Sequence, residues 1–258
     1  MSGSPEYYRK TQIERRIIMR GFFKRAAVFL LCCLFVRPVS ASGRLLPVYC
    51  VARTDRKMSL SFDAAWGNED TQTLIDTLAK YNVRVTFFVV GNWARKYPES
   101  VRALHEAGHE VMNHSNTHPH MTALSDAELK KEITECNAAI KSVTGVSPTL
   151  MRVPFGEYDN RVISAVRDQG MTCVQWDVDS LDWKDLSAKE IYDRVTSRIK
   201  PGSIVLFHNA ALHTTEALED ILLWLQKNDF EPVAISELLL EGDYTIDHEG
   251  RQTPKKPA

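Results

Sequence analysis

The sequence has few cysteines, no long hydrophobic run and no glycine-rich phosphate-binding loop. Its apolar run at residues 26–36 has 11 residues, whereas a membrane-spanning helix needs about 18 or more. No glycine-rich loop follows any stretch that is typical of a strand, which argues against a nucleotide-binding protein. Basic residues are scattered after residue 41, so a nucleic-acid-binding protein is also a poor fit.

Three of the five cysteines lie beyond residue 41, and none of these forms a pair with the spacing of a metal site. Cys136 falls on the apolar stripe of a predicted helix and Cys173 lies in a predicted strand, so we expect buried thiols. One disulfide among these two residues and Cys50 is also compatible with the sequence, which does not identify the pair.

The first 41 residues have the three-part composition of a secretory signal. A basic lead precedes the apolar run at 26–36, and the pattern VSA at 39–41 has small residues where a signal peptidase cleaves. We therefore predict an exported protein that is secreted or associated with the cell envelope or spore. A retained membrane segment is the less favoured alternative, because the apolar run is short. Without these residues the chain has 24 basic and 31 acidic residues, a net charge of −7.

Strand-like and helix-like stretches alternate along most of the remaining chain. Apolar residues at helical spacing separate runs that are rich in β-branched and aromatic residues. Parallel strands need such crossovers, so the alternation predicts an α/β domain with a parallel sheet, either a barrel or an open sheet. The seven predicted strands are residues 58–63, 83–91, 110–114, 149–153, 171–177, 203–208 and 230–234.

These elements define the expected domain organisation. An extended lead at 42–56 precedes a single domain at 57–241, and a polar tail follows at 242–258. We expect the tail to be loosely ordered, because it lacks the apolar periodicity of a buried element.

Ionisable residues gather where the predicted strands end. In parallel α/β folds the carboxyl ends of the strands form the functional site, and core packing does not require charged groups at matching positions. The residues concerned are Asp63, His114 with the nearby His118, Arg152, the group Asp177, Asp179 and Asp182, and His208.

Each of these residues also has an ordinary structural explanation. Asp63 could cap a turn, Arg152 could form an ion pair, and His208 could be a hydrogen-bonded core histidine. His114 and His118 could lie at the surface, or both could bind one metal ion, since neutral imidazole is a common ligand. We favour a single site, because ionisable groups occur together at five matching strand ends.

Five short motifs, in order along the chain, resemble those of the polysaccharide deacetylases that share the NodB homology domain, carbohydrate esterase family four. The similarity extends over residues 57–240 and is greatest to the sporulation-associated branch. The motifs are SFDA at 61–64, HSNTH at 114–118, RVPFG at 152–156, DSLDW at 179–183 and LFH at 206–208.

The resemblance implies a distorted (β/α)7 barrel and a divalent metal cofactor, which is zinc, cobalt or manganese in this family. It also implies a role for each matching residue. Asp63 corresponds to the general base and Arg152 to the residue that orients it. His114 and His118 correspond to the metal-binding histidines, and His208 to the general acid.

Three further residues take their roles from the same resemblance. Asp182 corresponds to the partner of the catalytic acid, and Trp183 to a wall of the cleft. Phe155 lies where a backbone N–H helps to hold the oxyanion of the reaction.

One position departs from the family pattern. The first motif of the family usually has two adjacent aspartates, of which the second binds the metal, but this chain has Ala64 there. A methyl group cannot coordinate, so Glu69, Asp70 or water could take the place of the missing ligand. Otherwise the protein holds metal weakly and has little activity.

These features predict an enzyme, a hydrolase that removes N-acetyl groups from the amino sugars of a cell-wall or spore-wall polysaccharide. Peptidoglycan is the first candidate substrate, and a chitin-like glycan is the other. Because Ala64 replaces the expected aspartate, the alternative is a weakly active or non-catalytic protein that binds glycan. A different metal hydrolase is a third alternative. The patterns H-x-H at 118–120 and H-E-x-x-H at 105–109 are present, but the five ordered motifs favour the deacetylase.

Overall fold

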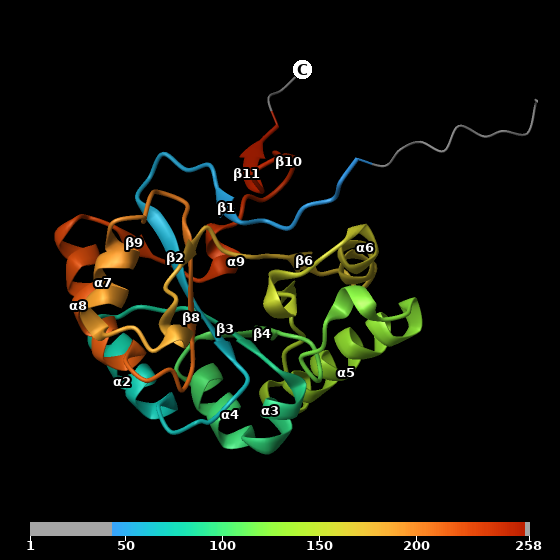
Figure 1. Ribbon diagram of the computed structural model, residues 1–258, viewed down its shortest axis with the longest axis horizontal. Helices are drawn as coiled ribbons and strands as arrows, with labels where there is room; N and C mark the ends of the chain where they lie inside the picture. The colour runs from blue at the N-terminus through green and yellow to red at the C-terminus, as the bar shows by residue number, and fades with distance from the viewer. Residues whose placement is uncertain (1–42, 256–258) are drawn as a thin grey trace, which may run out of the picture. The chain divides into compact units, whose positions relative to one another are not determined.

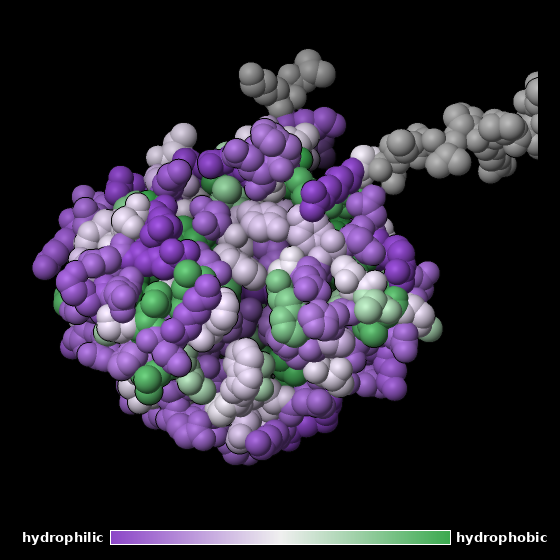
Figure 2. Space-filling model, in the orientation of Figure 1, coloured by the Kyte–Doolittle hydropathy of each residue, from purple (hydrophilic) through white to green (hydrophobic). Residues whose placement is uncertain are grey.

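A parallel sheet surrounded by helices organises the structure (Figure 1). The computed structural model describes residues 43–255, and residues from Arg44 onward belong to one structural unit. The predicted signal sequence at 1–41 therefore lies outside the described residues. The molecular surface is largely hydrophilic, with hydrophobic residues in separate small patches on the face in view (Figure 2).

Seven strands form the main sheet in the order β6-β5-β4-β3-β2-β8-β7, and each neighbouring pair is parallel. A further strand, β9 (Glu231–Pro232), pairs with the beginning of β2, also in parallel. This arrangement confirms the predicted distorted (β/α)7 barrel. The strands are β2 (Lys57–Ala64), β3 (Thr86–Val89), β4 (Glu110–Asn113), β5 (Leu150–Met151), β6 (Thr172–Cys173), β7 (Val178–Asp179) and β8 (Ile204–His208).

Helices connect the strands and cover the outside of the sheet (Figure 1). Two helices begin with a capping box: Ser125 caps α5 together with Glu128, and Ser187 caps α7 together with Glu190. The helices are α2 (Thr71–Lys80), α3 (Gly91–Lys96), α4 (Pro98–Glu106), α5 (Asp126–Thr144), α6 (Asn160–Asp168), α7 (Ala188–Thr196), α8 (Thr214–Lys227) and α9 (Ile235–Leu238).

The strand predicted at 171–177 is confirmed only in its first part, as β6 (Thr172–Cys173). A separate strand, β7, begins just beyond it at Val178 and lies at the other end of the strand order. β6 pairs with β5, whereas β7 pairs with β8. Between them Val174 bridges to Val48, and the Gln175 N–H donates to the Val48 carbonyl at 2.7 Å. The segment between β6 and β7 thus runs from one end of the strand order to the other and lies against the N-terminal lead.

Side chains of β2 alternate between two environments, as the period of a strand requires. Phe62 and Ala64 belong to an apolar cluster with residues of the surrounding helices. Ser59, Ser61 and Asp63 point the other way and are also buried. The Ser61 hydroxyl donates to the Val205 carbonyl at 2.7 Å. The interior of the barrel is therefore polar along β2, and Asp63 is the last member of this row.

The tail after Gly242 is ordered up to residue 255, contrary to the expectation from sequence. β10 (Tyr244–Ile246) and β11 (Arg251–Pro254) form an antiparallel hairpin, and β11 pairs in parallel with β1 (Cys50–Val51). Gln252, which is 1% exposed, holds the hairpin to Leu240 through both of its amide atoms. Backbone pairing, this amide and the packing of Ile246 against an apolar cluster order the segment. One apolar residue gives no hydrophobic periodicity, so the sequence pattern did not reveal it.

Two further expectations concern cysteines and membranes. Cys50, Cys136 and Cys173 are all buried and unpaired, so the described part of the chain contains free thiols rather than a disulfide. Between residues 43 and 255, no helix combines the length and the hydropathy needed to cross a membrane.

Candidate active site

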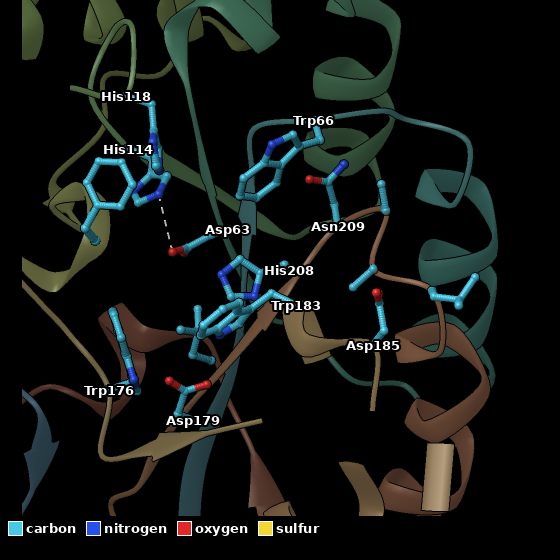
Figure 3. Close-up of a pocket in the computed structure, with 15 residues that line it drawn as sticks. Asp63, Trp66, His114, His118, Trp176, Asp179, Trp183, Asp185, His208 and Asn209 are labelled. Atoms are coloured by element: carbon cyan, nitrogen blue, oxygen red, sulfur yellow. Dashed lines mark ion pairs between the residues drawn. The ribbon is translucent and has the colours of Figure 1, made fainter. Parts of the chain in front are cut away.

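A cleft of about 800 Å³ opens at the carboxyl ends of the central strands (Figure 3). Arg152 and Asp182 lie behind its surface and are fully buried. Asp177 does not belong to the cleft. Its carboxylate accepts a hydrogen bond from the backbone N–H of Ile204, where β8 begins, so Asp177 lies at the end of β8 opposite to His208. The predicted site residues that line the cleft are Asp63, His114, His118, Phe155, Asp179, Trp183 and His208.

Asp63, at the end of β2, forms a buried ion pair with Arg152. Arg152 Nη1 donates to Asp63 Oδ1 at 2.8 Å, and Nη2 donates to Ser61 Oγ at 2.8 Å. Burial alone would raise the pKa of Asp63, but its interactions with His114 and Arg152 lower the pKa below the ordinary value. Asp63 is therefore an ionised carboxylate at neutral pH, with Oδ2 directed toward His114.

His114 is held as a neutral imidazole with a free lone pair. Its Nδ1 lies 2.8 Å from the Arg152 carbonyl oxygen, which can only accept, so Nδ1 carries the proton. Nε2 faces Asp63 Oδ2 at 3.4 Å. Burial lowers the pKa of His114 and also lowers the pKa of His118, to about 4. The two ring centroids are 4.9 Å apart, so two neutral imidazoles lie side by side at the cleft.

The loop after β4 brings these two histidines together through a tight local turn. The Ser115 N–H donates to Asn113 Oδ1 at 2.7 Å, and the His118 N–H donates to Ser115 Oγ at 2.9 Å. Ser115 and His118 both adopt positive φ, at 64° and 62°. Such angles are uncommon outside glycine, and here the side-chain hydrogen bonds of the loop hold them.

His208, at the end of β8, is backed by the buried carboxylate of Asp182. Its Nδ1 lies 2.8 Å from Asp182 Oδ1, and its backbone N–H donates to Oδ2 at 2.8 Å. Oδ2 also accepts from the Thr214 hydroxyl at 2.7 Å. Burial alone would lower the pKa of His208, but the hydrogen bond and charge of Asp182 outweigh it and raise the pKa above the ordinary value. His208 can therefore carry a proton near neutral pH.

Aromatic side chains form the walls of the cleft. Phe155 has a φ of 59°, and its ring packs edge-on against His118 and stacks on His120. Trp183 follows Asp182 in a 3-10 turn (Asp182–Lys184), and the Lys184 ammonium lies 4.8 Å from its ring centroid. The Phe155 ring is 54% exposed and the Trp183 ring 55%, so both rings present apolar surface to the cleft.

The residues present do not complete a divalent metal site. Ala64, at the position of the expected aspartate, is 1% exposed in the same apolar cluster as Phe62 and is not part of the cleft lining. In the described part of the chain, no three His, Cys, Asp or Glu side chains converge closely enough to hold a metal ion. His114 and His118 offer two donors, whereas a typical site has at least three from the protein.

The two loop acids considered as replacements do not reach the histidines. Neither Glu69 nor Asp70 is among the residues that line the cleft. Asp70 Oδ2 instead accepts the Ala210 N–H at 2.8 Å and ties two loops together. The structure therefore does not support Glu69 or Asp70 as the replacement for the carboxylate that is missing at Ala64.

Sequence reasoning missed several residues of the cleft. Trp66 and Asn209 lie in the loops just after Asp63 and His208, so position relative to a strand end could have signalled them. Leu206 lies in a strand and Trp176 lies between two strands. The sequence did not indicate that they face the cleft, because the direction of their side chains depends on how the strands curve around the barrel. The missed lining residues are Trp66, Trp176, Asp185, Leu206 and Asn209 to Leu212.

A parallel barrel with a buried carboxylate and a carboxylate-backed histidine at one cleft defines an acid–base centre of the kind that hydrolases use. The sequence model of the family described as "Polysaccharide deacetylase" matches residues 51–174. A chitooligosaccharide deacetylase of Sinorhizobium fredii is 34% identical, over 68% of this chain and 78% of its own length. The chain therefore belongs to the polysaccharide deacetylase family.

Two other relatives bear on the function. The peptidoglycan-N-acetylmuramic acid deacetylase PdaC of Bacillus subtilis is 34% identical over 70% of this chain, but the match spans only 38% of PdaC. A crystal structure of a mutant of BA3943 from Bacillus anthracis, described as a CE4 family pseudoenzyme with restored enzymatic activity, superimposes with a TM-score of 0.72. It is 33% identical, over 74% of this chain and 70% of that one.

Proposed function

We propose that this chain is an N-deacetylase that removes acetyl groups from the amino sugars of a cell-wall or spore-wall polysaccharide, with peptidoglycan as the first candidate. The observation that carries the proposal is the pairing of opposite protonation states in one cleft. Arg152 favours the ionised form of Asp63, and Asp182 favours the protonated form of His208. The relatives named as peptidoglycan and chitooligosaccharide deacetylases support the substrate class.

Hydrolysis of an N-acetyl group needs a base for water and an acid for the departing amine. Asp63 Oδ2 accepts the proton of the attacking water as oxygen bonds to the acetyl carbon. His208 donates the proton from its Nε2 to the amine nitrogen as the C–N bond breaks, so acetate and a free amino sugar leave. A backbone N–H at Phe155, whose positive φ turns the chain at the cleft, is suited to stabilise the oxyanion.

The proposal includes a divalent cation that binds at the cleft. The family resemblance implies a divalent cation, and His114 and His118 are the two donors that this chain provides. Because their set is incomplete, no step above depends on the cation. We propose that zinc, cobalt or manganese binds weakly at these two histidines and that water supplies further ligands.

The second candidate function is glycan binding without turnover. Ala64 removes the expected carboxylate, and the similarity to a CE4 pseudoenzyme favours this alternative. Release of acetate from N-acetylated peptidoglycan and from an N-acetylglucosamine tetramer separates the two candidates. Each glycan is incubated with the protein in the presence of chelator, zinc, cobalt or manganese. The Asp63→Asn variant is the matched control.

Acetate release that depends on Asp63 supports the deacetylase. Glycan binding with no acetate release under any of these conditions supports the non-catalytic function instead. We also propose export through residues 1–41, which can be tested by N-terminal sequencing of the protein recovered from the producing cells.

A further inference from the structure

Exposed apolar side chains concentrate around the cleft. Six large hydrophobic side chains are exposed among residues 43–255, and four of them line this cavity: Trp66, Phe155, Trp183 and Leu212. Large apolar groups that gather at one exposed place commonly mark a binding surface. Trp66 is the one aromatic member of this group to which the mechanism above and the family resemblance give no role.

The Trp66 ring lies beside His208, the proposed general acid, and beside His118. Its centroid is 6.1 Å from that of His118 and 5.9 Å from that of His208. In Figure 3 the rings of Trp66 and Trp183 appear on either side of the His208 ring. The Trp66 ring is 55% exposed, so much of its surface is free to contact a ligand in the cleft.

The backbone on both sides of Trp66 is anchored. The Gly67 carbonyl accepts from the Trp93 indole N–H at 2.9 Å and from the Asn209 amide. The Ala65 N–H donates to Asn209 Oδ1 at 3.2 Å. Trp93 is itself only 3% exposed, so the loop is held to the core on one side and to the loop after β8 on the other. An exposed indole on an anchored loop loses little conformational freedom when a ligand binds.

We propose that Trp66 is a glycan-binding residue whose indole face stacks on the apolar C–H face of an N-acetylated pyranose ring. The sugar so held presents its acetamido group between His118 and His208. Tryptophan suits this role, because it offers a large, flat apolar surface with few rotatable bonds. The inference rests on the proposed function for the identity of the ligand, but binding requires neither the third metal ligand nor turnover.

The test is calorimetric titration with an N-acetylglucosamine tetramer in the presence of chelator, so that binding is measured without catalysis. Trp66→Ala should weaken binding about tenfold or more, and Trp66→Phe, which keeps a smaller ring, should lose less. Tyr244→Ala is the matched control, because it removes an exposed aromatic side chain outside the cleft. This control should bind as the wild type does.

Trp66→Leu keeps apolar bulk without a ring face, so it tests the stacking even if the alanine variant does not fold. Wild-type affinity in a folded Trp66→Ala or Trp66→Leu protein would overturn the proposal. Absence of acetate release would count against the deacetylase alone, because the binding measurement does not depend on it. If the wild type binds neither the tetramer nor peptidoglycan fragments, both the glycan-binding role of Trp66 and the proposed function on glycans are wrong.

Discussion

Replacing Asp182 by asparagine tests the buried hydrogen-bond network behind His208. The carboxylate is fully buried and accepts four hydrogen bonds, from the His208 backbone N–H, His208 Nδ1, the Thr214 hydroxyl and the Trp183 N–H. An asparagine has a single acceptor oxygen with two lone pairs. At least two of the four donors therefore lose their acceptor, and the new amide N–H groups face donors.

The structure gives the size of this effect. A hydrogen bond to a charged group contributes about 1.5–3 kcal/mol, so loss of two should destabilise the fold by about 3–6 kcal/mol. In a domain of this size, about 1 kcal/mol corresponds to a shift of roughly 2–4 °C in the melting temperature. Asp182→Asn should therefore lower the melting temperature by roughly 6 °C or more, as measured by calorimetry or circular dichroism.

The effect should also depend on pH, because the pKa of His208 is raised in the folded protein. A raised folded pKa contributes stability that is fully present below about pH 6.5, the ordinary histidine value. That contribution is lost as the pH rises through the folded pKa. The difference between wild type and Asp182→Asn should therefore be larger at acidic pH than at alkaline pH.

Asp185→Asn is the matched control, because Asp185 is an exposed aspartate that follows the same 3-10 turn. It should leave the melting temperature unchanged. Wild-type stability in Asp182→Asn at acidic and alkaline pH would refute the reasoning, because a buried carboxylate with four donors cannot be replaced without loss if the network exists as described.

Three further predictions concern the cleft. Asp63→Asn and His208→Ala should each lower acetate release by roughly 10²–10⁴-fold with the fold intact by circular dichroism; unchanged turnover would remove that residue from the mechanism. Arg152→Met should destabilise the protein by about 3–5 kcal/mol in urea denaturation, because it leaves Asp63 charged and unpaired, and an unchanged midpoint would contradict the buried pair. Ala64→Asp should strengthen zinc binding in a calorimetric titration only if the new carboxylate turns from the apolar cluster toward the histidines; equal affinity with lower stability would mean that it stays in that cluster.

The sequence predicted the part of the site that follows from strand ends. Asp63, His114 and His208 each lie at or just after the end of a predicted strand, and parallel strands bring their carboxyl ends to one side. The same pattern included Arg152 and Asp182, and the resemblance to the deacetylase family assigned their roles beside partners that lie far away in the chain. Their hydrogen bonds required coordinates, because nothing in local sequence connects residue 63 with residue 152.

The failures of prediction have a common physical origin. An apolar stretch at 171–177 indicates strand, but how far the strand extends and which neighbour it pairs with depend on contacts distant in sequence. The C-terminal hairpin has little apolar surface, so its order comes mainly from backbone pairing that composition does not report. Trp66 and Asn209 were missed, because the direction of a loop side chain depends on anchors such as Trp93 and Asp70, which lie outside the motifs.

The pairing of β1 with β11 has a consequence for the order in which the domain assembles. Cys50 is in register with Arg251, and the Ala52 N–H donates to the Gln252 carbonyl at 2.8 Å. This contact closes a loop of roughly 200 residues, and contacts of such long range form late, because their loop entropy must first be offset by other structure. We therefore expect the pairing of β1 with β11 to form only after the rest of the barrel has been synthesised and folded. In pulsed hydrogen exchange during refolding, the Ala52 amide should gain protection after the amides of β2 and β3, and simultaneous protection would contradict this order.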